Sequence, residues 1–319
     1  MANDTLVAIG EALIDFIPDK TGCPFNEVTA FSPAVGGAPA NVCAAFTRLG
    51  GKSRMITQLG NDPFGDKITK RLSGAGIDTS CIRYTDEANT ALAFVSLEEN
   101  GNRTFSFYRK PSADMLLSAD EVNEDWFSGA YALHFCSVSI GNFPMRGAHE
   151  KAIGYARNAG AIISFDPNLR FPLWESKADL KAAVDKFIPA ADVLKISDEE
   201  LEFITGETEI KNALPKLFVG NVKLVIYTCG SEGAYAFTKN NEAFSPSEKV
   251  KAVDTTGAGD GFIGSFLHML YKKNITTDNI SDMSEADLKE CLDFSNKFCA
   301  VSVTKNGAID SYPSLNELQ

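Results

Sequence analysis

Short apolar runs alternate with segments of helical periodicity through the second half of this 319-residue chain, and that alternation limits its fold more than any other feature. The runs that predict strands lie at 132–138, 161–165, 192–196 and 224–227, and the segments that predict helices lie at 146–159 and 177–188. Strands joined through helices favour a mainly parallel sheet with helices on both faces. We therefore expect a three-layer α/β/α fold.

The first half shows the same alternation with one interruption. Strands are expected at 5–10 and 55–60, with helices from Pro39 to Leu49 and at 64–74. The β-rich runs 90–97 and 103–108 instead flank a hairpin signal at 98–102. We predict one domain over 1–319, in which segments near 12–34 and 89–112 form a small sheet that acts as a lid.

Polar clusters follow four of the expected strands. Ligands in parallel sheets bind beyond the carboxyl ends of the strands, so these clusters favour an enzyme over a scaffold. The clusters are Asp166–Arg170, Ser197–Glu200, Thr228–Gly233 and residues 253–262.

The last cluster, VDTTGAGDGF, opens directly into an apolar-periodic segment. The small residues of Gly257-Ala258-Gly259 allow a tight turn, and the first N–H groups of the following helix have no intrahelical partner. Such a turn binds anions. Asp260 would then take the proton of a hydroxyl that attacks a phosphoryl group. Alternatively, Thr255 or Thr256 caps the helix and Asp260 only favours its dipole.

Two earlier positions are ambiguous in the same way. Asp15 is a charge inside an apolar run, so it either faces water or holds a polar ligand. Asn41 lies in the first turn of a helix, after Gly36 and Gly37, where it serves either local capping or a ligand.

Composition excludes several classes of protein. A net charge of −12 argues against nucleic acid or an anionic membrane as the main partner. No apolar run approaches the roughly 20 residues of a membrane span. Seven scattered cysteines without a Cys-x-x-Cys spacing indicate reduced thiols, and the three histidines lack metal-ligand spacing. We expect a soluble, cytoplasmic protein.

GGAPAN at 36–41 and DTTGAGD at 254–260 together resemble the two signatures of the ribokinase-like (PfkB) carbohydrate kinases. The resemblance extends over the whole chain and is strongest to the fructokinases. It implies a ribokinase-like fold with a β-sheet lid, and transfer of the γ-phosphate of ATP to the 6-hydroxyl of D-fructose.

The resemblance also implies roles for individual residues. Asp260 would be the base, the amides of Gly257, Ala258 and Gly259 would hold the developing charge, and Arg170 would clamp phosphate. The residues implied to bind the sugar or lie near the phosphates are Asp15, Gly36, Gly37, Asn41, Arg109 and Asn168.

On the nucleotide side, the implied residues are Thr228, Gly230, Gly233 and, near the adenine, Asn296. Glu200 would act on Mg²⁺ through water. A K⁺ site is implied around Asp254, Thr256, Val303, Gly307 and Ser311. Many members have Asn where this chain has Ser197, which puts the role of that side chain in doubt.

Three alternatives stay open at this point. A sibling kinase would act on ribose or 2-keto-3-deoxygluconate, and a regulator on the same fold would bind sugar without catalysis. The third alternative is a dinucleotide-dependent oxidoreductase, but the Gly-x-Gly-x-x-Gly turn of that class is missing from this sequence.

The lid sheet could also pair two copies of the chain into a homodimer.

Overall fold

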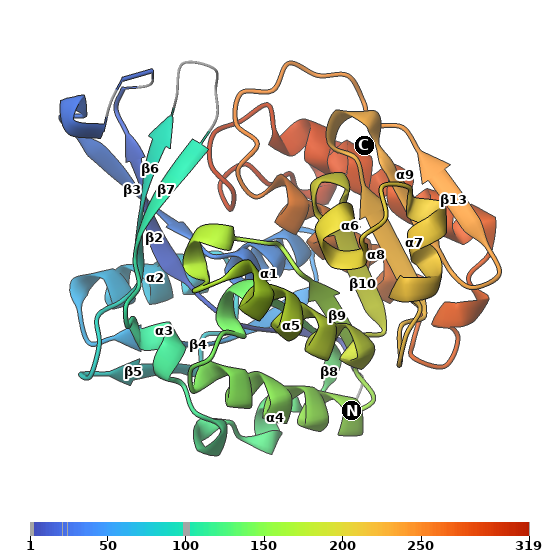
Figure 1. Ribbon diagram of the computed structural model, residues 1–319, viewed down its shortest axis with the longest axis horizontal. Coiled ribbons are helices and arrows are strands. Elements are labelled where there is room, and N and C mark those ends of the chain that lie inside the picture. Colours follow the sequence, from blue (N-terminus) through green and yellow to red (C-terminus); the bar gives the residue numbers. More distant parts are fainter. Residues whose placement is uncertain (1–2, 21, 24, 98–102, 319) are drawn as a thin grey trace.

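The computed structural model describes residues 3–20, 22–23, 25–97 and 103–318. A central sheet has the strand order β13-β12-β11-β10-β9-β8-β1-β4-β5, and a separate sheet has the order β3-β2-β6-β7 (Figure 1). The hairpin turn expected at 98–102 lies outside the described residues.

The strands of the central sheet are mostly parallel, and only the edge strands β12 and β13 run antiparallel to their neighbours. The bounds of its strands are β1 Thr5–Ile9, β4 Lys52–Gly60, β5 Ile82–Thr85, β8 Ala130–Cys136, β9 Ile162–Asp166, β10 Val193–Ser197, β11 Leu224–Thr228, β12 Ala234–Phe237 and β13 Glu242–Ser245.

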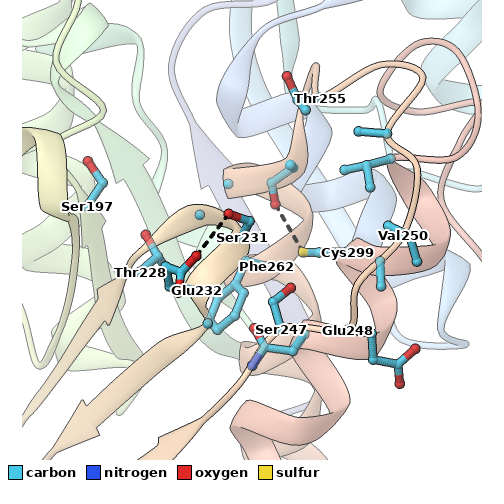
Figure 2. A pocket seen from close by; sticks show the side chains of 18 of the residues that line it. Ser197, Thr228, Ser231, Glu232, Ser247, Glu248, Val250, Thr255, Phe262 and Cys299 are labelled. Atoms are coloured by element: carbon cyan, nitrogen blue, oxygen red, sulfur yellow. Dashed lines mark hydrogen bonds between the residues drawn. The ribbon is translucent and has the colours of Figure 1, made fainter.

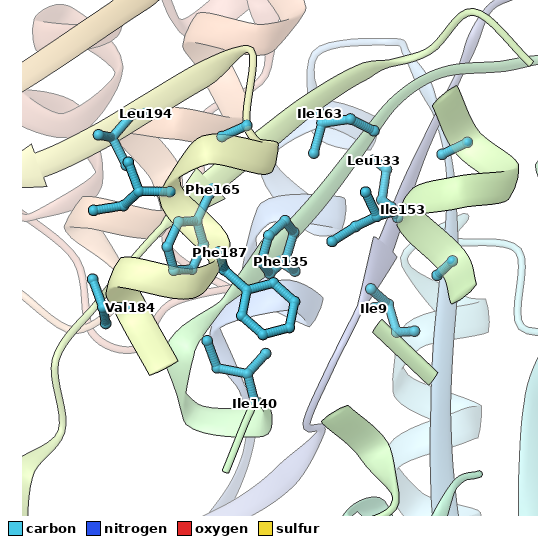
Figure 3. Packing of buried hydrophobic residues seen from close by; sticks show 14 of the residues in the cluster. Ile9, Leu133, Phe135, Ile140, Ile153, Ile163, Phe165, Val184, Phe187 and Leu194 are labelled. Carbon is cyan, nitrogen blue, oxygen red and sulfur yellow. The ribbon is translucent and has the colours of Figure 1, made fainter. Parts of the chain in front are cut away.

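Helices cover both faces of this sheet, with bounds α1 Ala38–Arg48, α2 Pro63–Gly74, α3 Ala113–Leu116, α4 Met145–Asn158, α5 Lys177–Phe187, α6 Asp198–Thr205, α7 Ile210–Leu217, α8 Ala258–Lys272 and α9 Glu285–Ser302. Period-two alternation explains the layers. In β8, Leu133 and Phe135 pack into the core that contains α4 and α5, whereas Ala132 packs into the core that contains α8 and α9 (Figure 3). The expected three-layer α/β/α architecture with a mainly parallel sheet is confirmed.

The small sheet consists of β2 Leu13–Pro18, β3 Phe31–Gly36, β6 Leu92–Leu97 and β7 Arg103–Tyr108. It projects from one side of the main body in Figure 1. Its strands come from the two segments that the sequence analysis assigned to a lid. Whether the sheet closes over a ligand stays a prediction.

Several elements were not predicted. β12 and β13 are only four residues long each, so they offer too few positions for a period-two pattern. The helices α6 and α7, between the expected strands 192–196 and 224–227, were also missed.

Candidate active site

The turn at the start of α8 requires glycine at its first position. Gly257 has φ 73°, and a Cβ there would lie 2.5 Å from Cβ of Ala308. Tyr312 Oη donates to the carbonyl of Gly257 at 2.8 Å and fixes the turn. The amide of Ala258 is bonded to the carbonyl of Thr255, but the amide of Gly259 has no acceptor within the described part of the chain. The turn therefore presents a backbone donor at a helix N-terminus, as an anion site needs.

Asp260 lies beside Asn41, although the two residues are 219 positions apart in the sequence. Nδ2 of Asn41 donates to Oδ2 of Asp260 at 2.8 Å. The helices that carry them approach closely, since a Cβ on Gly264 of α8 would lie 2.9 Å from the carbonyl oxygen of Val42 in α1. Burial raises the pKa of Asp260, opposed by the Asn41 hydrogen bond and by the charges of Arg170 and Lys195. A carboxylate with a raised pKa is a better proton acceptor than an ordinary aspartate.

The carboxylate of Asp15 lies across Gly36, on the neighbouring strand. A Cβ on Gly36 would sit 2.2 Å from Oδ2 of Asp15, so a larger residue would displace that carboxylate. Gly37 has φ 110°, and its Cβ would lie 2.5 Å from the carbonyl oxygen of Glu11. Because Gly36 and Gly37 have no side chains, β3 and the start of α1 can pack closely against the segment that follows β1.

Arg109 is buried, and its guanidinium is anchored within the protein. Nε donates to Oδ2 of Asp114 at 2.9 Å, and Nη1 donates to the carbonyl of Val138 at 3.0 Å. The same group lies 5.6 Å from the ring centre of Phe143. These contacts hold the end of β7 against the main body, while a contact between Arg109 and a sugar stays a prediction.

Glu11 was not identified from the sequence. It is buried at the end of β1, and it accepts hydrogen bonds from Oγ of Ser139 at 2.6 Å and from the amide of Ala38 at 3.3 Å. Burial raises its pKa, opposed by the charge of Arg109. Its position directly before an apolar run, in Gly-Glu-Ala-Leu, was the available signal.

The loop after β9 carries Asn168 and Arg170. Asn168 has φ 43°, a left-handed conformation that asparagine tolerates, and its amide donates to Oδ1 of Asp166 at 3.2 Å. Arg170 is exposed, and its Nη1 donates to the carbonyl of Leu169. Its charge acts on Asp260, so the guanidinium is close enough to assist an anion bound at the turn.

Glu200 joins this loop to α6. Its two carboxylate oxygens accept from the amides of Leu169 at 2.7 Å and Ser197 at 2.9 Å. The Ser197 contact is half of the capping box that starts α6. An effect of Glu200 on a metal ion stays a prediction, and within the described residues no group of three or more His, Cys, Asp or Glu could hold a metal.

A cavity of about 690 Å³ opens beside the turn, and Figure 2 shows Ser197, Thr228, Thr255 and Cys299 around it. The predicted nucleotide-side residues all line it: Thr228, Gly230, Gly233 and Asn296, together with Ala258 and Gly259 of the turn.

Asn296 links α9 to the end of β13 at one side of this cavity. Its Nδ2 donates to the carbonyl of Ser245 at 2.9 Å, at the end of β13. Gly233 approaches the same carbonyl, which would lie 2.2 Å from a Cβ at that position. The observed contacts of Asn296 are therefore with the chain itself, and its proximity to an adenine stays a prediction.

The residues predicted around a K⁺ ion converge as well. Oδ1 of Asp254 accepts from the amide of Thr256 at 2.8 Å, and Oδ2 accepts from the amide of Gly307 at 2.8 Å. The carbonyl of Val303 accepts from the amide of Asp254 at 3.2 Å. Ser311 is buried and bonded to Ser302 at 2.6 Å. These contacts tie the segment before the turn to the C-terminal loop.

Lys195 is the second residue that the sequence analysis missed. It lies in β10, lines the cavity, and donates to Oδ2 of Asp166 at 2.9 Å. The signal was a single lysine inside the apolar run Asp-Val-Leu-Lys-Ile. A charge in a buried strand needs a buried partner, and here the neighbouring strand β9 supplies it with Asp166.

Comparison with known proteins assigns this chain to one protein family. Residues 3–315 match the pfkB family of carbohydrate kinases. Fructokinase-2 of Solanum lycopersicum is 44% identical over 313 residues, which cover 98% of this chain and 94% of the relative. The structure of fructokinase with bound ATP from Xylella fastidiosa matches with a TM-score of 0.91 and 33% identity, over 100% of this chain and 97% of that one.

A double mutant of the fructokinase from Vibrio cholerae O395, in its fructose, ADP and potassium ion bound form, matches with a TM-score of 0.86 and 32% identity. The match covers 99% of this chain and 97% of that one. None of the described helices is long and apolar enough to cross a membrane. The whole-chain match and the shared fold lead to one conclusion: this chain belongs to the pfkB family of carbohydrate kinases.

Proposed function

We propose that this protein is an ATP-dependent fructokinase, which transfers the γ-phosphoryl group of ATP to the 6-hydroxyl of D-fructose and releases fructose 6-phosphate. The observation that carries the proposal is the position of Asp260. Its carboxylate contacts Asn41 and directly follows Gly259, whose amide lies at the cavity. Asp260, as the proposed base, would then lie between a polar cluster that would bind sugar and a cavity that would bind nucleotide.

In the proposed reaction, the protein supplies alignment and charge stabilisation. Asp15 and Asn41 would bind sugar hydroxyls, and Asp260 would accept the proton of the attacking hydroxyl. The amides of the turn and the guanidinium of Arg170 would stabilise charge on the phosphoryl group. The small sheet would exclude water, which otherwise competes with the sugar.

ATP would enter with Mg²⁺, which neutralises phosphate charge when bound. Glu200 would act on that ion through water, while its two oxygens stay hydrogen-bonded to the amides of Leu169 and Ser197. We propose K⁺ as the ion near Asp254. The potassium-bound fructokinase structure supports it, as does the convergence of Asp254, Thr256 and Gly307.

The first experiment is ADP release from Mg-ATP over a panel of fructose, ribose, glucose, 2-keto-3-deoxygluconate, fructose 1-phosphate and adenosine. Fructose should give the highest kcat/KM. Turnover on ribose or 2-keto-3-deoxygluconate instead would keep the mechanism and replace the substrate. A folded protein that binds sugar without turnover on any of them would favour the non-catalytic regulator.

We also propose a cytoplasmic homodimer that forms through the small sheet. Tyr108 is 65% exposed and Phe25 is 45% exposed, and both rings pack near Phe94. An exposed aromatic patch of this kind suits a second copy of the chain. Sedimentation of the wild type and of Tyr108→Ser tests it: the dimer should weaken in the variant, and a monomeric wild type would exclude it.

A further inference from the structure

Lys195 lies where the floor of the cavity meets the turn before α8. Its side chain is buried, and its Nζ is 2.9 Å from Oδ2 of Asp166, the last residue of β9. A Cβ built on Gly259 would lie 3.3 Å from the same Nζ. The ammonium group is therefore next to the residue whose free amide marks the anion site.

Three carboxylates act on this ammonium group: those of Asp166, Glu200 and Asp260. Burial lowers the pKa of Lys195, but these carboxylates outweigh the burial and raise it. Lys195 is therefore a permanent cation at neutral pH. Without the Lys195 ammonium group, the negative charge of these carboxylates would repel a nucleoside triphosphate from this end of the cavity.

The ammonium group also has donors to spare. It carries three N–H bonds, and Asp166 accepts one of them. Within the described residues no other acceptor is placed for the remaining donors. Glu200 makes its hydrogen bonds to the amides of Leu169 and Ser197, and none joins it to the Lys195 ammonium group. A buried cation with unused donors, at the wall of a cavity, is arranged to bind an anion.

We propose that Lys195 is a further catalytic residue, whose ammonium group binds the γ-phosphoryl group during transfer while Asp166 holds the ammonium in place. The proposal rests on the proposed kinase function. In the step, a bond forms between the sugar hydroxyl oxygen and the γ-phosphorus as the bond from that phosphorus to the bridging oxygen breaks. The electron pair of the broken bond leaves with ADP, and the hydroxyl proton goes to Asp260. Lys195 exchanges no proton and offsets charge on the phosphoryl oxygens.

The location of Lys195 separates its role from that of Arg170. Arg170 is exposed on a loop, and the hydrogen bond of its guanidinium goes to the carbonyl of the adjacent Leu169. Lys195 is carried by a strand in the interior of the sheet, and Asp166 already fixes its ammonium group. A preorganised charge of this kind contributes to the transition state without reorganisation cost.

The test compares two nucleotides that differ in the γ-phosphoryl group. Calorimetry measures the binding of Mg-ADP and of the Mg complex of β,γ-methylene ATP to the wild type and to Lys195→Met. We expect the variant to lose about tenfold or more in affinity for the analogue, with little change for ADP. We also expect kcat to fall by about 10²-fold or more, the usual effect of removing one donor to a developing anion. Lys195→Arg should recover part of both losses.

Lys223→Met is the matched control. Lys223 also lies beside a buried aspartate, with Nζ 3.5 Å from Oδ1 of Asp192, but at the amino end of the strands and away from the cavity. The Lys223→Met variant should bind Mg-ADP and the analogue with the same affinities as the wild type. Equal losses for ADP and analogue in Lys195→Met, or a kcat within about threefold of the wild type, would overturn the proposal.

A second variant keeps the test valid if Lys195→Met does not fold. In the double variant Lys195→Met/Asp166→Asn, both charges of the buried pair are removed, so no carboxylate is left there without a cation. This variant should show the same selective loss of affinity for the analogue. The proposed function fails separately: a wild type that phosphorylates no sugar would refute the fructokinase, whereas the two-nucleotide comparison would still decide whether Lys195 contacts the γ-phosphoryl group.

Discussion

Two buried aspartates at opposite ends of the same parallel strands have similar partners and different surroundings. At the carboxyl end, Asp166 pairs with Lys195 beside the cavity. At the amino end, Asp192 is fully buried, accepts from the amide of Ile163 at 2.9 Å, and lies 3.5 Å from Nζ of Lys223. Both pairs join neighbouring strands, but only the first lines a cavity.

The difference follows from the direction of the strands. In a parallel sheet, loops and helix N-termini meet at the carboxyl ends, where free amides attract anions. At the amino end, the carboxylate of Asp192 accepts a hydrogen bond from the amide of Ile163 and lies near the cations of Lys223 and Arg157. Two similar ion pairs therefore lie in different settings: the Lys195–Asp166 pair borders the cavity, where we propose a role in phosphoryl transfer, and the Lys223–Asp192 pair lies away from it, where we expect a role in stability.

Asp260→Asn should produce the largest effect at the carboxyl end. Without the base, kcat should fall by about 10³-fold or more. The raised folded-state pKa of Asp260 means that the ionised carboxylate lowers stability above the unfolded value of 3.8. Asparagine removes that cost, so the melting temperature at pH 7 should stay equal or rise. Steady-state kinetics and thermal unfolding measure both, and a variant that unfolds or retains full activity would contradict this assignment.

Gly257→Ala should come next. A side chain at φ 73° is strained and would meet Ala308 and Tyr312, so the turn must move. We expect kcat to fall by about 10²-fold as the turn's donors lose alignment.

Gly74→Ala is the control for Gly257→Ala, because a Cβ there meets nothing within 4 Å. That variant should gain up to about 1 kcal/mol of stability with unchanged kinetics. Normal turnover in Gly257→Ala would show that the turn does not bind the phosphoryl group.

Asp192→Ala tests the amino end directly. It leaves the amide of Ile163 without its acceptor and the nearby cations of Lys223 and Arg157 without their partner. The free energy of unfolding should drop by about 3 kcal/mol, while kcat and KM stay near wild type. Denaturant unfolding and kinetics on the same preparation give both numbers. A loss of activity without a loss of stability would contradict the purely structural role that we assign to Asp192.

The pH dependence should show the smallest effect. Because Asp260 must be ionised, kcat/KM should fall as pH decreases through its pKa, which burial raises above the ordinary 3.8. Asn41→Ala removes a hydrogen bond that lowers the pKa of Asp260, so the acid limb should move to higher pH. A pH–rate profile measures the limb, and a shift to lower pH would exclude Asp260 as the titrating group.

Local sequence patterns are sufficient to predict the layers of the fold and the turn at the start of α8. Alternating apolar runs and helical periods predict a parallel sheet, and Gly257-Ala258-Gly259-Asp260 has a local meaning, since a tight turn and a helix start depend on adjacent residues. The proximity of the Asp15 carboxylate to Gly36 is also a local matter, because the two residues lie on adjacent strands of one hairpin-like segment.

The contacts between residues that are distant in the sequence could not be predicted from local patterns. The contact between Asn41 and Asp260, the cluster of Glu11 with Ser139, and the pair of Lys195 with Asp166 all join separate elements. Such contacts depend on strand order and on how closely helices pack, which no local pattern encodes. A lone charge in an apolar strand predicts that a partner exists, but the neighbouring strand determines which residue it is.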